Sequence, residues 1–283
     1  MVGIVAGADS TTITIFGHGI TVPERFELSA GIWLGPSLTR LDVSAAASGS
    51  GRFSDYAAAL QGDEIATFEM VVEEAAGGEE LVVKGWNALW LFHLLSVACG
   101  SPCLSLYSVC DGNEPKYSAA SRTPFVRPVP EIHPATSRQL NWAKEHLESF
   151  ESLAKIPEFE SAMKCFGNAH YLPDHDIRIM LLWAGIEGLL SVDAELSRRL
   201  ALYAAILMDG TPDQKAAYFD EVKKAYAIRS QAVHGAKAKP DKLVVGYSLA
   251  SRILAGLLKR CVEVGRVPSP AELDRLAVGA TIA

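Results

Sequence analysis

From Pro134 onward, apolar residues recur with helical spacing almost to the end of the chain. Between Ala194 and Met208 they fall at i, i+4, i+7, i+8 and i+11, which is one stripe of a 3.6-residue period. Asp193 is a candidate N-cap for this segment and Gly210 a candidate stop. The same spacing predicts further helices over residues 136–153, 158–170, 174–190, 212–234 and from 241 onward. About six helices with short connections predict a helical bundle.

The pattern before residue 130 is mixed. Short β-like runs cover residues 12–16, 26–34 and 81–83, and helix-like segments cover residues 63–76 and 86–98. Residues 45–51 are small and flexible, and residues 111–134 carry five prolines, which suits an extended connection. We therefore expect an α+β protein, in which a mixed α/β domain (1–130) precedes an all-α bundle (131–283).

Composition narrows the class of protein. The five cysteines form no CxxC pair, and the N-terminus lacks a basic leader, so we expect reduced thiols in the cytoplasm. The apolar stretch at residues 86–99 is interrupted by Asn87 and His93 and is too short to cross about 30 Å of hydrocarbon. We therefore expect no membrane span.

The net charge of -7 argues against nucleic-acid binding only when it is averaged over the whole chain. Residues 1–130 hold 7 basic and 14 acidic residues, whereas residues 131–283 hold 19 of each. Within the latter, residues 215–266 contain eleven basic and four acidic residues, a net charge of +7. Two interpretations remain open, a solvated helix face and a surface that binds a phosphate backbone.

An Arg-x4-His pair, Arg229 and His234, lies at the predicted end of a helix inside this basic window. Histidine exchanges protons near neutral pH, and arginine offers a planar cation with donors matched to phosphate oxygens. At about 100° per residue the two side chains lie roughly 140° apart on a straight helix. Either the helix unwinds before His234, which Gly235 would permit, or the site is assembled across a dimer.

The stretch LLWAGIEGLLSVDAELSRRLALYAAILM (181–208), followed by AYAIRSQAVHG (225–235), resembles the Apea-like branch of the HEPN superfamily. The resemblance covers roughly residues 135–265. It implies a metal-independent endoribonuclease of a defence or toxin system that acts as a homodimer, with Arg229 and His234 as the catalytic pair. It further implies supporting roles for Ser230 and Glu187, to which we add the neighbouring Tyr226.

One position departs from the family. The HEPN branch that is modified on a tyrosine two residues after the histidine would need Tyr at position 236, where this chain has Ala236. This departure argues against a toxin regulated in that way.

A mechanism that uses the 2′-hydroxyl predicts RNA as the partner, because DNA lacks that group. We expect the RNA backbone to contact Lys223, Lys224, Lys237 and Lys239. No metal and no cofactor are expected. The alternative is a non-catalytic HEPN module that binds RNA or a protein. A regulatory protein or ligand at the N-terminal domain is a further hypothesis, for which no residue identifies the ligand.

Other constellations predict structure rather than chemistry. His170, Asp174, His175 and Asp176 are metal-capable types, but Asp174 is a candidate N-cap after Pro173. Cys99 and Cys103 lie in apolar surroundings, which favours buried thiols over a zinc site. Gly17-His18-Gly19 lacks the third glycine of a dinucleotide-binding loop. The five tryptophans favour the core, and Glu73, Glu74, Glu79 and Glu80 favour an acidic, solvated rim.

Overall fold

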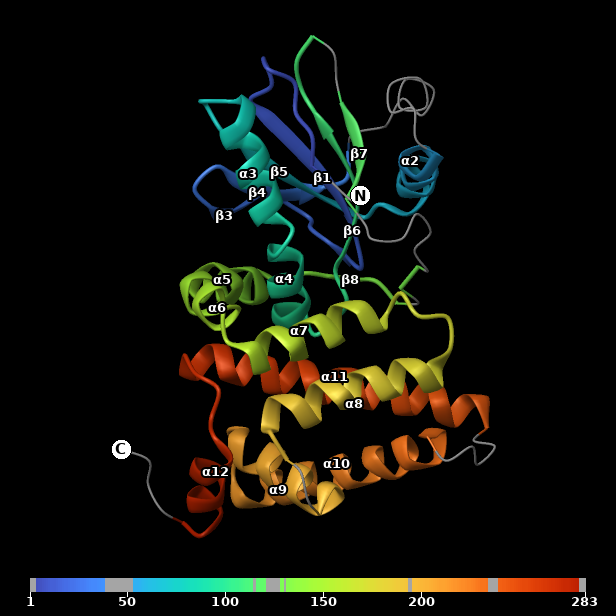
Figure 1. Cartoon of the computed structure of the whole chain (residues 1–283), viewed down its shortest axis with the longest axis vertical. Coiled ribbons are helices and arrows are strands. Elements are labelled where there is room, and N and C mark those ends of the chain that lie inside the picture. Colours follow the sequence, from blue (N-terminus) through green and yellow to red (C-terminus); the bar gives the residue numbers. More distant parts are fainter. Residues whose placement is uncertain are drawn as a thin grey trace. The chain divides into compact units, whose positions relative to one another are not determined.

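The computed structural model describes residues 4–38, 53–113, 116–120, 128–129, 131–192, 195–233 and 239–279. The chain divides into an N-terminal unit, residues 1–145, and a C-terminal unit, residues 146–283. The mixed α+β class is confirmed, with an antiparallel sheet in the N-terminal unit and helices in the C-terminal unit (Figure 1).

The N-terminal unit combines strands and helices. Its strands are β1 (Thr12–His18), β2 (Ile20–Thr21), β3 (Phe26–Ser29), β4 (Ile32–Pro36), β5 (Phe68–Glu73), β6 (Leu104–Cys110), β7 (Tyr117–Ala119) and β8 (His133–Pro134). Its helices are α2 (Phe53–Ile65), α3 (Gly78–Ala88), α4 (Leu91–Cys99) and α5 (Ser137–Glu145). Six strands form one sheet in the order β3-β4-β5-β1-β6-β7, while β2 and β8 pair in parallel.

The two faces of this sheet are covered by different helices. Side chains alternate along a strand, so Ile13 and Ile15 face one side of β1 while Phe16 faces the other. On the first side, Gly85 of α3 lies so close to Ile13 that an added Cβ would stand 3.0 Å from it. On the second side, Phe16 stacks on Tyr107 with ring centroids 4.4 Å apart. Helix α2 approaches there, since a Cβ on Gly62 would meet the Tyr107 ring at 2.2 Å.

His18, the last residue of β1, is buried and makes hydrogen bonds to two other segments of the chain. Its side chain is 2% exposed, and Nδ1 lies 2.7 Å from the Ile65 carbonyl oxygen at the end of α2. The Val129 amide donates to Nε2 at 2.8 Å. Because Nε2 accepts a hydrogen bond, the proton of the neutral ring sits on Nδ1. The His18 side chain therefore links the end of β1 to the end of α2 and to Val129.

The C-terminal unit contains helices throughout the part that the structure describes. These are α6 (Leu147–Leu153), α7 (Pro157–Ala169), α8 (His175–Leu190), α9 (Leu196–Leu207), α10 (Pro212–Val233), α11 (Pro240–Val264) and α12 (Pro270–Ala277). Helix α8 packs against α7, α10 and α11, and α12 packs against α9. Gly185 permits this close packing, because a Cβ there would lie 2.9 Å from atoms of Cys165 and Leu254.

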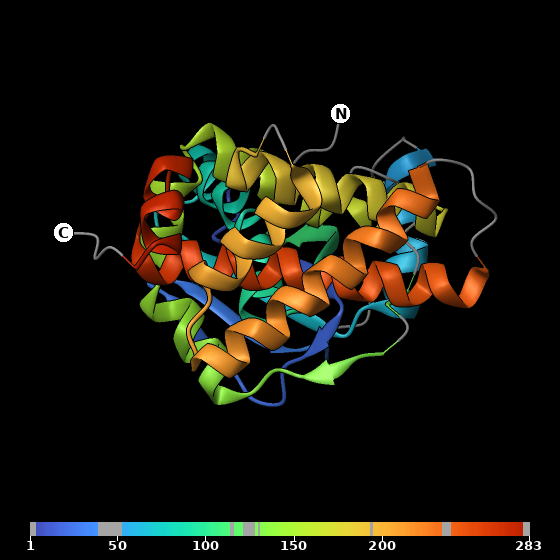
Figure 2. The same ribbon diagram turned by 90° about the horizontal axis from the view of Figure 1, so that it is seen from below.

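Helices α10 and α11 run antiparallel, as their side-chain contacts demonstrate (Figure 2). Lys242 donates to Gln231 at 2.8 Å, and Arg252 pairs with Glu221, so positions rise along α11 as they fall along α10. Pro240 begins α11, in agreement with the expected stop and restart of the chain in this region.

Several local predictions were wrong. Residues 63–76 are not one helix, because Phe68, Met70 and Val72 alternate with more exposed side chains and form β5. Residues 81–83 are helical rather than extended, since Leu81, Gly85 and Ala88 recur with helical spacing on the buried side of α3. The apolar run at 86–98 divides between α3 and α4.

The predicted helix at 136–153 is two helices, and the chain divides between them. Helix α5 belongs to the N-terminal unit, where it packs against α4 and β3. Lys144 on α5 donates to the Glu27 carbonyl oxygen at 2.9 Å. The division therefore follows Glu145 rather than residue 130. The predicted loop at 45–51 lies outside the described residues.

Among the described residues, Gly78–Cys99 is long and apolar enough to cross a membrane by length and composition. In the structure this segment comprises α3 and α4, and 56% of its most apolar stretch is buried within the protein. Seven of the nine residues of α4 are buried.

Candidate functional site

Arg229 on α10 and Glu187 on α8 form an ion pair in the C-terminal unit. Their Nη2 and Oε1 atoms lie 3.1 Å apart, and each side chain is 22% exposed. Because both side chains are mostly buried, water and salt weaken the attraction between their charges less than they would for a pair on the surface. The structure thus brings together two residues that the family resemblance singles out.

Two aromatic rings support the pair from the same two helices. Trp183 lies one turn before Glu187 on α8, and Tyr226 lies three residues before Arg229 on α10. The Trp183 and Tyr226 rings meet edge to face, with centroids 5.1 Å apart at 90°. The Arg229 guanidinium carbon lies 5.4 Å from the Tyr226 ring centroid. These contacts orient Arg229 by cation–π attraction as well as by charge.

This cluster contains buried polar atoms that no other described residue satisfies by a hydrogen bond. They are Trp183 Nε1, Glu187 Oε1 and Arg229 Nε. The Arg229–Glu187 contact is close enough for an ion pair but lacks the alignment of a hydrogen bond. An unsatisfied buried donor costs free energy, so these atoms mark the cluster as a polar site rather than ordinary core.

The other predicted site residues divide into described and undescribed positions. Ser230 is half-buried beside Arg229 on α10, and Lys223, Lys224 and Lys239 are exposed. His234 and Lys237 lie outside the described residues.

The ten basic residues of the window at 215–266 that the structure describes do not gather in one place. At 1.5 Å per residue, Lys215 lies about 21 Å along α10 from Arg229. Three arginines of the window, besides Arg229, pair with carboxylates: Arg252 with Glu221, Arg260 with Asp209 and Arg266 with Glu272. No described carboxylate pairs with Lys223 or Lys224, whose ammonium groups lie on the same helix as Arg229. The electrostatic support for phosphate binding thus narrows to a few lysines.

The metal-capable residues at 170–176 contribute to packing. His170 is 2% exposed and its Nδ1 lies 3.3 Å from the Tyr247 hydroxyl, while His175 meets the Tyr247 ring edge to face. Arg178 places its guanidinium 5.2 Å from the same ring. Asp174 does precede α8, but its side chain makes no capping hydrogen bond. No cluster of three metal-capable residues occurs within the described part of the chain.

The burial of the five cysteines indicates a structural role for their thiols. Cys103, Cys110 and Cys261 are buried, and Cys99 and Cys165 are partly buried. Burial raises the pKa of the Cys261 thiol to about 12 and also raises that of Cys165. Thiols with raised pKa values are poor nucleophiles at neutral pH.

Sequence reasoning missed two features of this region. Trp183 was assigned to the core, where it is 0% exposed, but its unsatisfied indole N–H next to the ion pair was not anticipated. The second is an apolar stripe on α8, formed by the exposed residues Ile177, Met180, Ala184 and Gly188. The i, i+3, i+7, i+11 spacing of these residues was the available signal.

Comparison of the chain with protein-family models, with curated proteins and with solved structures found no match.

Proposed function

We propose that the C-terminal unit is a HEPN-like domain that cleaves RNA without a metal, with Arg229 binding the scissile phosphate and His234 transferring protons. The observation that carries this proposal is the Arg229–Glu187 ion pair at 3.1 Å. The family resemblance predicts these two residues as functional from separate segments of the sequence. Their shielded contact, with Trp183 and Tyr226 beside it, is what a site that orients an arginine requires.

The chemistry follows from the side chains. A base removes the proton of the 2′-hydroxyl, and the resulting oxygen attacks phosphorus. The bond to the 5′-oxygen then breaks, and an acid protonates that oxygen. The products are a 2′,3′-cyclic phosphate and a 5′-hydroxyl. Arg229 stabilises the charge that develops on the phosphoryl oxygens, and His234 serves as base or acid near neutral pH.

A homodimer through α8 completes this proposal, because the reaction needs two proton-transfer groups and each chain offers one His234. Ile177 is 43% exposed and Met180 is 44% exposed on the α8 stripe. Nothing lies within 4 Å of where a Cβ would stand on Gly188, so a second helix has room to approach there. Glu187 adjoins Gly188, and a twofold axis across the stripe would bring two copies of the Arg229 cluster near one another.

The test is cleavage of a labelled RNA in EDTA by the full chain. We expect a 2′,3′-cyclic phosphate product, no cleavage where the RNA carries a single 2′-deoxy nucleotide, and at least a hundredfold loss in Arg229→Ala and His234→Ala. Arg252→Ala is the matched control, because it removes an arginine of the same window that already pairs with Glu221. Full cleavage by the Arg229 and His234 variants would refute the proposal.

The second candidate, a non-catalytic module that binds RNA, gives a different result in the same assay. The wild-type chain would bind the RNA and leave it intact, and Arg229→Ala would weaken binding.

A further inference from the structure

An exposed apolar stripe occupies one side of helix α3 in the N-terminal unit. Val83 is 53% exposed, Trp86 is 42% exposed and Trp90, which follows the helix, is 40% exposed. Val83 and Trp86 lie three residues apart on one face of α3, and Trp90 lies in the short turn that leads from α3 into α4. Large apolar side chains grouped in this way differ from single exposed residues, which need no explanation.

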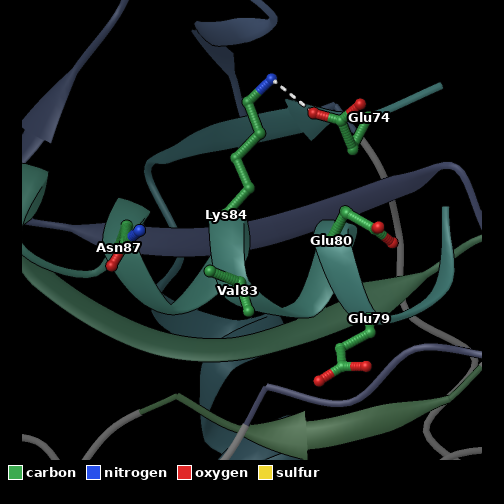
Figure 3. Close-up of a pocket in the computed structure, with 6 residues that line it drawn as sticks. All are labelled: Glu74, Glu79, Glu80, Val83, Lys84 and Asn87. Carbon is green, nitrogen blue, oxygen red and sulfur yellow. Dashed lines mark hydrogen bonds and ion pairs between the residues drawn. The ribbon is translucent and has the colours of Figure 1, made fainter. Parts of the chain in front are cut away.

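A shallow cavity of about 430 Å³ adjoins this stripe (Figure 3). It is lined by Glu74, Glu79, Glu80, Val83, Lys84 and Asn87. Val83 belongs to both features, so the cavity and the stripe form one surface, which we name the α3 surface (residues 74, 79, 80, 83, 84, 86, 87 and 90).

The charge of the α3 surface is acidic. Its one cation, Lys84, donates to the Glu73 carbonyl oxygen at 2.7 Å and lies 3.5 Å from the Glu74 carboxylate. Figure 3 shows the Lys84 side chain directed toward Glu74, while Glu79 and Glu80 extend elsewhere. No described cation pairs with Glu79 or Glu80. Glu79 lies on the same face of α3 as Val83 and Trp86, at i, i+4 and i+7, so an uncompensated carboxylate begins the apolar stripe.

A surface that combines indole rings with carboxylates that no described cation neutralises is suited to one kind of partner. Tryptophan is enriched among the residues that dominate protein–protein binding energy, and its ring face attracts ammonium and guanidinium groups. Carboxylates attract the same cations and repel the phosphates of RNA and of anionic lipids. The acidic excess of residues 1–130 extends this preference beyond the immediate contact.

We propose that the α3 surface binds a lysine- or arginine-rich segment of a partner protein. Trp86 and Trp90 would contact the apolar parts of the partner's side chains, and Val83 connects these indoles to the cavity. Glu79 and Glu80 would attract the partner's cations. This inference concerns the N-terminal unit alone and does not depend on the ribonuclease proposal.

The test uses the full chain and a fluorescein-labelled Arg-Ser repeat peptide, with a Glu-Ser repeat peptide of equal length as the negative control. Fluorescence anisotropy at low salt should report binding of the Arg-Ser peptide only. We expect Trp86→Ala and Trp90→Ala each to weaken binding by about tenfold or more. Val83→Lys should weaken it similarly by placing a cation on the surface, and its side chain is exposed enough to leave the fold intact.

A matched pair of variants separates local from general charge. Glu79→Gln/Glu80→Gln should weaken binding several-fold and reduce its salt dependence. Glu24→Gln/Glu64→Gln removes the same charge from exposed positions of the same unit and should weaken binding much less than the first pair does. Equal effects of the two pairs, or no effect of the tryptophan variants, would overturn the proposal.

Two further arms address other occupants. Phosphatidylcholine and phosphatidylserine vesicles should not sediment the wild-type chain, and vesicle binding that is lost in Trp86→Ala would overturn the proposal in favour of a membrane surface. If Trp86→Ala lowers the mass of the free protein in sedimentation velocity, the occupant is a second copy of the chain, and the proposal of a separate partner is wrong.

Discussion

Arg229 and Glu187 lie 3.1 Å apart although they belong to different helices, α10 and α8, separated in the chain by α9. The contact fixes the direction of the guanidinium. It also offsets part of the free energy that is lost when the guanidinium is removed from water. It also means that a phosphate must compete with, or join, a carboxylate that is already in place. The ion pair is therefore both a stability element and a part of the proposed site.

Replacing either partner should destabilise the C-terminal unit. We expect Glu187→Gln and Arg229→Gln each to lower the free energy of unfolding by about 1–3 kcal/mol, since each leaves a shielded charge without its counter-charge. The double variant should lose less than the sum of the two. Urea unfolding of the four proteins measures the coupling.

The exposed pair Arg252 and Glu221 provides the control for this cycle. The Arg252 side chain is 65% exposed, so its coupling to Glu221 should lie near the 0–1 kcal/mol range of surface pairs, at about 0.5 kcal/mol. A coupling between Glu187 and Arg229 no larger than this would show that their contact adds nothing specific.

The α8 stripe gives a prediction about assembly. Met180→Glu places a charge in the middle of the apolar stripe and should convert a dimer to a monomer, because burying an unpaired carboxylate is unfavourable. Sedimentation velocity measures the mass, and RNA cleavage should fall in parallel. Val278→Glu, at a residue that is 83% exposed after α12, is the control and should change neither property.

If Met180→Glu leaves the mass unchanged, the dimer does not use this stripe. A dimer that persists while cleavage falls would instead place Met180 in the site itself.

The lysines near Arg229 give a prediction about salt. Lys223→Gln/Lys224→Gln should weaken binding of single-stranded RNA and make the slope of log K against log salt shallower by about 0.7 per lost phosphate contact. Arg260→Gln is the comparison, because Arg260 already contacts Asp209 at 2.8 Å. It lies on α11 eight residues beyond Arg252, which pairs with Glu221, and so away from the end of α10 that carries Arg229. A similar loss of slope in both variants would indicate diffuse charge rather than a localised site.

The sequence predicted the helices of the C-terminal unit well for a physical reason. Helices such as α9 and α11 bury one face, so their apolar residues recur with the helical period. The N-terminal unit was harder, because its elements are short: β5 has six residues and α3 eleven, so each carries only about three buried positions from which a period can be read. Leu81 to Val83 is β-prone in composition but helical in its tertiary context.

The site was predicted in part. Arg229 and Glu187 were chosen from a motif, and their contact depends on the crossing of α8 and α10, which no local pattern encodes. The net charge of the window at 215–266 overstated its attraction for phosphate. Arg252, Arg260 and Arg266 form ion pairs with carboxylates, and two of these carboxylates lie outside the window. Composition counts charges, whereas binding depends on which charges remain unpaired.

His18 gives the prediction on pH. Burial lowers the pKa of His18 below its ordinary value of 6.5, and the hydrogen bond to Ile65 offsets only part of this. The neutral ring accepts a hydrogen bond from Val129 at Nε2, and protonation would set an N–H there against the Val129 N–H. The unfolded chain therefore binds a proton more readily than the folded one, so stability falls as the pH drops below about 6.5.

The measurement is the urea midpoint of the N-terminal unit between neutral and mildly acidic pH, in the wild type and in His18→Gln. The glutamine cannot titrate in this range and retains an acceptor for the Val129 amide, so the variant should be less stable at neutral pH but should lose less stability on acidification. If the two proteins show the same pH slope below 6.5, another group than His18 controls the acid response, because the wild type alone carries a depressed histidine pKa at this position.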